Sequence, residues 1–137
     1  MIVLDTNVIS AVIGDHAEPR IVTWLDAVPE LICLTSITAA ELRLGAALLP
    51  AGRRRARLQE EIEAMLTEDF ADAVLPFDEP ASTAYAAVVA GRRSSGRPIS
   101  VLDAQIAAIC VSRGAALATR NVRDFDGTGV TVVDPWT

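Results

Sequence analysis

Short runs of apolar residues alternate along this chain with longer segments in which apolar residues recur every three or four positions. A short apolar run bounded by polar residues is typical of a buried strand, whereas spacing by three or four indicates a helix. The pattern predicts strands at residues 2–5, 31–34, 74–77, 115–118 and 130–133. It predicts helices at residues 6–14, 19–28, 37–49, 53–70, 81–93 and 100–114.

The alternation of short strands with helices predicts the fold class. Parallel strands need crossover connections, and these connections place helices on both faces of the sheet. We therefore expect an α/β fold with three α/β/α layers around a central, mainly parallel sheet. At 137 residues and 51% hydrophobic composition, the chain suits one compact domain, so we expect residues 1–137 to form a single domain.

Neither membrane insertion nor secretion is indicated by the sequence. The opening residues lack a cationic region and a long apolar segment, and no apolar stretch is long enough to span a bilayer. We expect a soluble cytoplasmic protein with no membrane partner. Cys33 and Cys110 fall in an apolar strand pattern and an apolar helix pattern, which favours two reduced core thiols over a disulfide or a metal pair.

Four acidic residues follow or approach predicted strand ends. Asp5 ends the first strand, Glu41 lies one turn into the helix after the second, and Asp103 opens the helix that starts near residue 100. Asp124 follows the strand that ends near Thr119. Because ligands of open α/β sheets bind beyond the carboxyl ends of the strands, we expect all four acids to face one crevice at that edge.

Clustered carboxylates indicate a cation site. They repel one another and raise each other's pKa values unless a cation or an arginine compensates. Hard oxygen ligands of this kind suit Mg²⁺ or Mn²⁺. Such a metal lowers the pKa of bound water, orients it for attack on phosphorus and stabilises the charge on the leaving oxygen. The four acids therefore predict a divalent-metal nuclease site.

Each acid also has a purely structural interpretation. Residues 38–41 match a capping box, in which the acid binds backward to backbone amides, and residues 100–103 fit the same pattern more loosely. Asp5 could cap the helix after it, and Asp124 could be a turn or cap residue. Joint placement at one edge favours a shared site, since independent capping does not require it.

Charge and composition narrow the chemistry. The net charge is −6, but without the four candidate acids the balance is −2, so overall acidity does not exclude nucleic acid. All twelve basic residues are arginine; the absence of lysine excludes P-loop, Schiff-base and phosphoacceptor receiver mechanisms. His16, the sole histidine, lies in an early loop, which argues against a Ser-His-Asp triad, a Cys-His dyad and a histidine-rich zinc site.

Several motifs, in this order and spacing, resemble those of PIN-domain ribonucleases. They are Ile2-Val3-Leu4-Asp5-Thr6-Asn7-Val8-Ile9-Ser10, Thr38-Ala39-Ala40-Glu41-Leu42, the run from Pro98 to Ala108 that contains Leu102-Asp103-Ala104, and Ala118-Thr119-Arg120-Asn121-Val122-Arg123-Asp124-Phe125. The closing Val133-Asp134-Pro135-Trp136 resembles the VapC branch, the toxins of bacterial type II toxin-antitoxin modules. The resemblance spans the whole chain.

This resemblance implies a PIN-like fold and a Mg²⁺-dependent endoribonuclease that cleaves structured RNA, often tRNA. It implies inhibition by a cognate antitoxin protein whose tail covers the acidic site. It also implies a homodimer, and contact with DNA only indirectly, through the antitoxin.

Site residues are carried over from the family motifs position by position. Asp5 and Asp103 match the main metal ligands, and Glu41 matches the third acid. The fourth position stays open between two residues. Some relatives place an aspartate directly after the Thr-Arg pair, where this chain has Asn121, and others use the acid of the Asp-Phe pair, here Asp124.

Neighbouring polar residues are candidates for supporting roles. Thr6 and Thr119 offer hydroxyls beside the acids that could hold carboxylates or phosphate in place, although Thr6 could also be a simple helix cap. Arg120 and Arg123 flank the fourth acid and are the favoured RNA contacts, ahead of arginine clusters at residues 53–57 and 92–97. Aromatic residues make up only 4% of the chain, so we expect recognition by RNA shape rather than by base stacking.

Other functions remain open at this point. A haloacid-type phosphohydrolase would need a second aspartate two residues after Asp5, and that position is Asn7. A housekeeping or DNA-directed metal nuclease of the same fold, and a catalytically inactive binding module, are the remaining alternatives.

Overall fold

A five-stranded sheet in the order β3-β2-β1-β4-β5 runs through the middle of the molecule. The computed structural model describes residues 1–137. The strands are β1 (Ile2–Leu4), β2 (Ile32–Thr35), β3 (Val74–Leu75), β4 (Ala116–Ala118) and β5 (Val132–Val133). Every neighbouring pair is parallel, and Val3 of β1 aligns with Cys33 of β2 and Leu117 of β4. The predicted sheet is confirmed, and it is parallel throughout.

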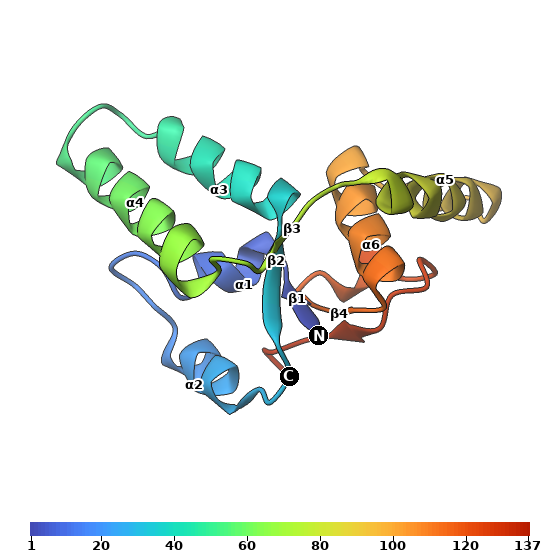
Figure 1. Ribbon diagram of the computed structural model, residues 1–137, viewed down its shortest axis with the longest axis horizontal. Coiled ribbons are helices and arrows are strands. Elements are labelled where there is room, and N and C mark those ends of the chain that lie inside the picture. The colour runs from blue at the N-terminus through green and yellow to red at the C-terminus, as the bar shows by residue number, and fades with distance from the viewer.

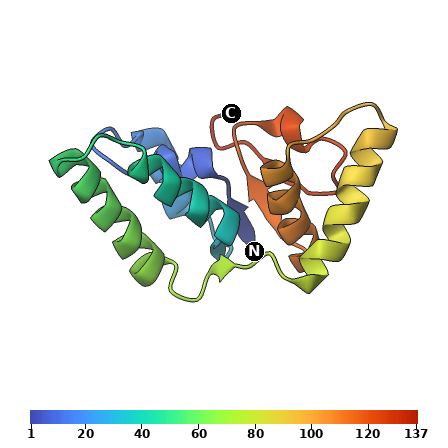
Figure 2. The same cartoon turned by 90° about the horizontal axis from the view of Figure 1, so that it is seen from above.

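Six α-helices cover the two faces of the sheet. They are α1 (Thr6–Ser10), α2 (Pro19–Ala27), α3 (Ser36–Ala47), α4 (Arg53–Ala64), α5 (Glu79–Ser94) and α6 (Val101–Arg113), with a short π-helix η1 (Met65–Asp69) after α4 and a 3₁₀ turn η2 (Val122–Phe125) after β4. Figures 1 and 2 show α3 and α4 on one side of the sheet and α5 and α6 on the other. The three-layer prediction is therefore confirmed.

Alternation along the central strand explains the two-sided core. Ile2 and Leu4 belong to the hydrophobic cluster shared with α1 to α4, whereas Val3 belongs to the cluster shared with α5 and α6. Successive strand side chains point to opposite faces, so one short apolar strand supplies both cores. Ile9 and Ile109 are each at most 2% exposed on opposite sides of the sheet. This double burial fixes the carboxyl end of β1 at the centre of the molecule.

Several elements are shorter than the sequence predicts. Helix α1 ends at Ser10 rather than at residue 14, and β3 covers only residues 74–75. Pro76 follows β3 directly, and proline cannot donate a ladder hydrogen bond, which stops this edge strand early. The predicted helix over residues 53–70 is divided into α4 and the π-helix η1.

Both cysteines are buried, as predicted, and burial raises the pKa of the Cys110 thiol to about 12. None of the helices combines the length and apolar character needed to cross a membrane.

Candidate active site

A polar cavity of about 490 Å³ lies at the carboxyl edge of the sheet. Its lining comes from segments that follow β1, β2, β4 and β5 and from the start of α6, and consists of Asp5, Thr6, Asn7, Ser10, Ala11, Glu18, Glu41, Asp103, Arg120, Asn121 and Trp136. Three of the four acids singled out in the sequence therefore share one cavity. Parallel strands bring these distant positions together, because all their carboxyl ends meet at one edge.

Asp5 is the innermost acid of the cavity. It caps α1, and its Oδ1 accepts a hydrogen bond from the backbone N–H of Thr6 at 2.8 Å. Its Oδ2 accepts from the Thr119 hydroxyl at 2.7 Å and from the Asn7 amide at 3.4 Å. With 5% exposure, the carboxylate is fixed by these donors. Asp5 is thus both a helix cap and a member of the acidic site.

Glu41 does not cap a helix, which corrects the capping-box alternative for this residue. Helix α3 begins one turn earlier, at Ser36, and its cap is Thr35, whose hydroxyl accepts from the backbone N–H of Thr38 at 3.1 Å. Glu41 lies in the second turn and accepts from the Thr6 hydroxyl at 2.9 Å. Thr6 lies inside α1 rather than capping it, so its hydroxyl is free to link α1 to α3.

Asp103 enters the cavity from the first turn of α6. Ser100 caps this helix, and its hydroxyl accepts from the backbone N–H of Asp103 at 3.2 Å. The capping interpretation is therefore confirmed for Ser100. The Asp103 side chain is partly exposed and lines the cavity opposite the end of β1.

Asp5, Glu41 and Asp103, three of the four acids that line the cavity, are each destabilised in their ionised form. Burial is the largest cause raising the pKa of Asp5, Glu41 and Asp103 above their ordinary values. Repulsion adds to it, since the charge of Asp5 raises the pKa of the other two. The ion pairs of the molecule join Arg43–Glu63, Arg57–Asp15, Arg97–Asp126 and Arg113–Asp78, and none includes these acids. No ion pair therefore neutralises these three carboxylates, and their cavity favours a cation.

The donor set fits a hard divalent cation. The lining offers carboxylate, amide and hydroxyl oxygens, which are the ligands that Mg²⁺ prefers. No group of three or more His, Cys, Asp or Glu side chains is arranged to hold a metal by protein ligands alone. Mg²⁺ commonly takes only one or two carboxylates and fills its other positions with water and substrate phosphate, so a partial protein shell suits this ion.

The two candidates for the fourth position occupy different places. Asn121 lines the cavity directly after β4. Asp124 is exposed on η2 and does not belong to the lining, although its charge raises the pKa of Asp5 and Asp103 in addition to the larger effect of burial. Arg123, also on η2, is exposed outside the lining.

Asn7 lines the cavity, although the sequence indicated no role for it beyond its place in the opening motif and its mismatch to a haloacid-type phosphohydrolase. Its amide donates to the Thr119 hydroxyl at 3.2 Å, and its Oδ1 accepts from the backbone N–H of Arg120 at 3.2 Å. The Thr119 hydroxyl also accepts from the backbone N–H of Asn121 at 3.0 Å. Asn7 and Thr119 therefore join the ends of β1 and β4 around Asp5. The signal available in the sequence was an amide in the first turn after the strand-end acid.

Trp136 and Glu18 form the rim beside Arg120. The indole Nε1 of Trp136 donates to Glu18 Oε2 at 2.8 Å. The guanidinium carbon of Arg120 lies 5.0 Å from the centroid of the indole, a cation–π distance. Arg120 is exposed and lines the cavity, and its guanidinium is stacked on Trp136. Glu18 and Trp136 are 118 residues apart, so their contact was not visible in the sequence.

Arg92 belongs to one of the arginine clusters considered for RNA contact, but it is only 6% exposed. Its charge lowers the pKa of Asp103, an effect smaller than the raising by burial. Because the side chain is enclosed, Arg92 has no surface to offer RNA.

Known proteins resemble this chain over almost its full length. The PIN domain family model matches residues 2–129. The VapC ribonuclease Y4jK of Sinorhizobium fredii is 42% identical, over 99% of this chain and 98% of its own. The toxin FitB of Neisseria gonorrhoeae is 40% identical, over 99% of both chains. The tRNA(fMet)-specific endonuclease VapC of Shigella flexneri is 29% identical, over 77% of this chain and 75% of its own.

Solved structures agree with this similarity. The crystal structure of FitAcB from Neisseria gonorrhoeae superposes with a TM-score of 0.92 at 40% identity, over 99% of both chains. The structure of FitAB bound to the IR36 DNA fragment gives 0.92 at 39% identity, over 100% of this chain and 96% of the other. VapBC-5 of Mycobacterium tuberculosis, from the VapBC family of toxin-antitoxin systems, gives 0.69 at 27% identity, over 96% and 94%. This chain therefore belongs to the PIN-domain family, in its VapC-type branch.

Proposed function

We propose that this protein is the metal-dependent endoribonuclease toxin of a bacterial toxin-antitoxin module. The observation that carries the proposal is the convergence of Asp5, Glu41 and Asp103 on one cavity with no arginine paired to them. Burial and repulsion raise the pKa values of these carboxylates and so destabilise their ionised forms. A divalent cation would stabilise the ionised forms. The names of the whole-length relatives, a VapC ribonuclease and a toxin, support the same conclusion.

In this proposal Asp5 and Asp103 hold Mg²⁺ or Mn²⁺, with Glu41 as the third acid. When bound, the ion supplies a water of lowered pKa and stabilises charge on the phosphodiester. Thr119 and Thr6 keep the carboxylates of Asp5 and Glu41 in place through their hydroxyls. Such outer contacts orient ligands before the substrate arrives.

We assign different roles to the two residues that are candidates for the fourth position. Asn121 offers its amide oxygen from the cavity wall, where it can bind a water or the ion. Asp124 supplies negative charge from η2 at the edge of the site, as its effect on Asp5 and Asp103 indicates.

Arg120 is the proposed contact for the substrate phosphate next to the cut. It lines the acidic cavity and is stacked on Trp136, whose indole is fixed by Glu18. A stacked guanidinium loses less freedom when it binds phosphate than a free one does. Arg123 is a second, more exposed candidate on η2. We propose structured RNA such as tRNA as the substrate, and the name of the Shigella relative supports that choice.

The proposed partners are a cognate antitoxin, which covers the acidic cavity, and a second copy of the chain. Similarity to FitAcB and to a structure named for a toxin-antitoxin family supports the antitoxin. DNA would be reached only through the antitoxin, in line with the FitAB complex on IR36 DNA. Val88 of α5 is 5% exposed and lies in the monomer core, so its side chain is not available for contact with a second copy.

The proposal is tested by cleavage of three matched substrates with the purified chain. Folded tRNA, an unstructured RNA of equal length and duplex DNA are incubated with Mg²⁺ or with EDTA. We expect cleavage of the folded RNA in Mg²⁺, none in EDTA, and none by Asp103→Asn. Cleavage of DNA alone would identify a DNA-directed nuclease, and failure of the folded wild type on every substrate would identify an inactive binding module.

A further inference from the structure

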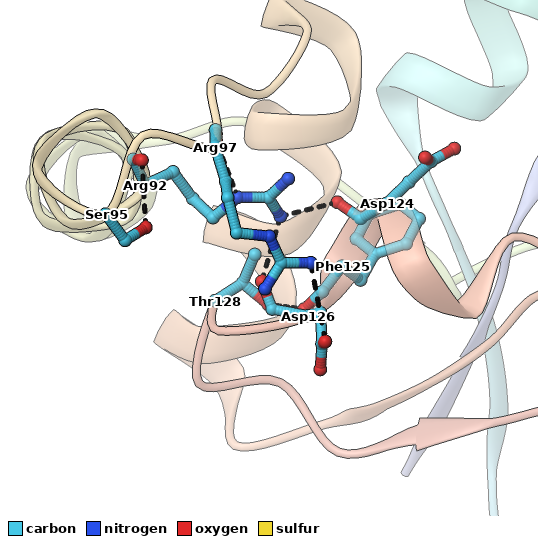
Figure 3. Close-up of polar contacts among 7 residues, drawn as sticks. All are labelled: Arg92, Ser95, Arg97, Asp124, Phe125, Asp126 and Thr128. Atoms are coloured by element: carbon cyan, nitrogen blue, oxygen red, sulfur yellow. Dashed lines mark hydrogen bonds and ion pairs between the residues drawn. The ribbon is translucent and has the colours of Figure 1, made fainter.

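Arg92 is a buried cation that binds backbone carbonyls in place of an acid. It lies near the end of α5 and is 6% exposed. Its Nε donates to the Arg97 carbonyl at 2.6 Å, and its Nη1 donates to the carbonyls of Asp124 and Asp126 at 2.8 and 2.9 Å (Figure 3). A buried guanidinium is tolerated only when hydrogen-bonded, and its planar shape fixes several acceptors at once. Arg92 therefore ties the turn after α5 to η2.

Side-chain donors bind three consecutive carbonyls at the end of η2, those of Asp124, Phe125 and the following Asp126. Between the two carbonyls bound by Arg92, the Phe125 carbonyl accepts from the Thr128 hydroxyl at 2.6 Å. The Phe125 ring itself is 1% exposed in the core beneath. Backbone groups that bind side chains in this way have few alternatives in position, so the turn is set by Arg92, Phe125 and Thr128 together.

The η2 turn contains Asp124, whose side chain is a carboxylate. Figure 3 shows its carboxylate pointing away from Arg92 while its carbonyl accepts from the guanidinium. Arg92 thus contacts the backbone of Asp124 and leaves its side chain available. The carboxylate lies close enough to Asp5 and Asp103 to raise the pKa of both, after the larger effect of burial. The place of this charge at the site depends on the backbone of η2.

We propose that Arg92 is a positioning residue that holds Asp124 at the edge of the acidic cavity through the carbonyls of η2. The inference rests on the proposed nuclease function for its catalytic readout. The positioning role predicts that replacing Arg92 lowers kcat through Asp124. The losses of kcat from replacing Arg92 and Asp124 should therefore not add. A residue that only stabilises the fold has no such dependence.

The test is a double-mutant cycle on cleavage of folded RNA in Mg²⁺. Arg92→Gln removes the fork of donors, and we expect kcat to fall about 10–100-fold with KM within about twofold, because a displaced catalytic group slows the chemical step more than binding. Arg92→Lys keeps the charge but cannot hold the same carbonyls, so we expect no rescue. In the Asp124→Asn background, Arg92→Gln should cause no further loss of kcat.

Asp126→Asn is the matched control in the same turn. It removes the exposed ion pair to Arg97 but leaves the backbone carbonyl that Arg92 binds. We expect wild-type kcat from this variant. Equal loss of kcat in Asp126→Asn, or multiplicative losses from Arg92→Gln and Asp124→Asn, would contradict the positioning role.

Hydrogen exchange separates this inference from the proposed function. In the folded Arg92→Gln and Arg92→Lys variants, amides of residues 122–126 should exchange at least about tenfold faster than in the wild type, while those of β1 stay protected. Unchanged exchange at η2 would overturn the contact with Arg92 whatever the activity. A wild-type protein that cleaves nothing, with η2 still released by these variants, would instead refute the nuclease function alone.

Discussion

Asp5 and Asp103 face the same cavity but are held in different ways. Asp5 is buried at the end of β1 and accepts hydrogen bonds from Thr6, Thr119 and Asn7. Asp103 is partly exposed on the first turn of α6, where the Ser100 hydroxyl accepts from its backbone N–H at 3.2 Å and also lowers the pKa of its carboxyl group, an effect smaller than the raising by burial. The inner acid is therefore buried and held by three donors, whereas the outer acid is more exposed and has fewer hydrogen-bond partners.

This difference has a chemical use. In the proposed function, the buried carboxylate of Asp5 would define where the cation lies, and the more exposed carboxylate of Asp103 would have room to adjust to the substrate. Glu41, partly exposed and bound by the single hydroxyl of Thr6, resembles Asp103 more than Asp5. The site thus consists of one rigid acid and two acids with more freedom, and variants can be chosen to act on each kind.

The largest effect is expected from removing the acids themselves. Asp5→Asn and Asp103→Asn should each lower kcat on folded RNA by about 10³-fold, since in the proposed function each removes a carboxylate that would hold the ion. Asp5→Ala should in addition lower the free energy of unfolding by about 1 kcal/mol, because it removes the cap of α1. Steady-state cleavage and urea unfolding measure the two effects. Equal destabilisation by Asp103→Ala would contradict the contrast between the two acids.

A smaller loss is expected from the hydroxyls that hold the acids. Thr119→Val is nearly isosteric and removes the hydrogen bond to Asp5, so metal affinity or kcat should fall about 10–100-fold. Thr6→Val removes the bond to Glu41, which water can replace at that more exposed carboxylate. Cleavage measured over a Mg²⁺ titration compares the two. If kcat or metal affinity falls more in Thr6→Val than in Thr119→Val, Glu41 rather than Asp5 is the more tightly held acid.

Arg120 should affect substrate binding more than chemistry. Arg120→Gln removes the cation over the cavity, and we expect KM for RNA to rise about 5- to 10-fold with a shallower dependence on salt. Trp136→Leu should have a smaller effect of the same kind, because it only releases the arginine. The control is Arg113→Gln, whose cation is paired with Asp78 elsewhere. An unchanged KM in Arg120→Gln would assign RNA contact to other arginines.

The smallest effect is on stability and its pH dependence in the absence of metal. Burial raises the pKa of Asp5 above its ordinary 3.8, so the folded protein takes up this proton at higher pH than the unfolded chain does. The cost of the ionised carboxylate is therefore absent below the unfolded pKa and appears as pH rises through the folded pKa. Asp5→Asn should have a higher Tm than the wild type in EDTA at about pH 8, and this difference should shrink toward about pH 4. A difference that grows on acidification would have the wrong sign.

The parts of the site that the sequence predicted are acids placed at the end of a strand or in the early turns of a helix. Asp5 follows a four-residue apolar run, and Glu41 and Asp103 occupy early turns of helices after the second strand and the 94–98 loop. Parallel topology then brings such positions to one edge whatever the loops between them. The alternation of strands and helices that sets this topology also predicted the sheet correctly. Its edge strands β3 and β5 are shorter than predicted, because an edge strand depends on few contacts.

What the sequence did not predict depends on contacts between distant segments. Asn7 meets Thr119 across 112 residues, and Glu18 meets Trp136 only because the chain end returns to the start of α2. Arg92 stood in a run of surface-like residues, yet the return of η2 to the turn after α5 buries it. Residues 38–41 have the spacing of a capping box but do not act as one. Helix α3 begins one turn before them, at Ser36. Local periodicity in the sequence predicts none of these contacts, nor the start of α3.

Binding of Mn²⁺ to the RNA-free protein tests the central claim most directly. Titration followed by electron paramagnetic resonance, with Asp126→Asn as a charge-matched control outside the cavity, counts bound ions without any need for catalysis. The account predicts saturable binding to the wild type and to Asp126→Asn, and at least about tenfold weaker binding to both Asp5→Asn and Asp103→Asn. Wild-type affinity in either of the last two variants would contradict a shared cation site between these acids.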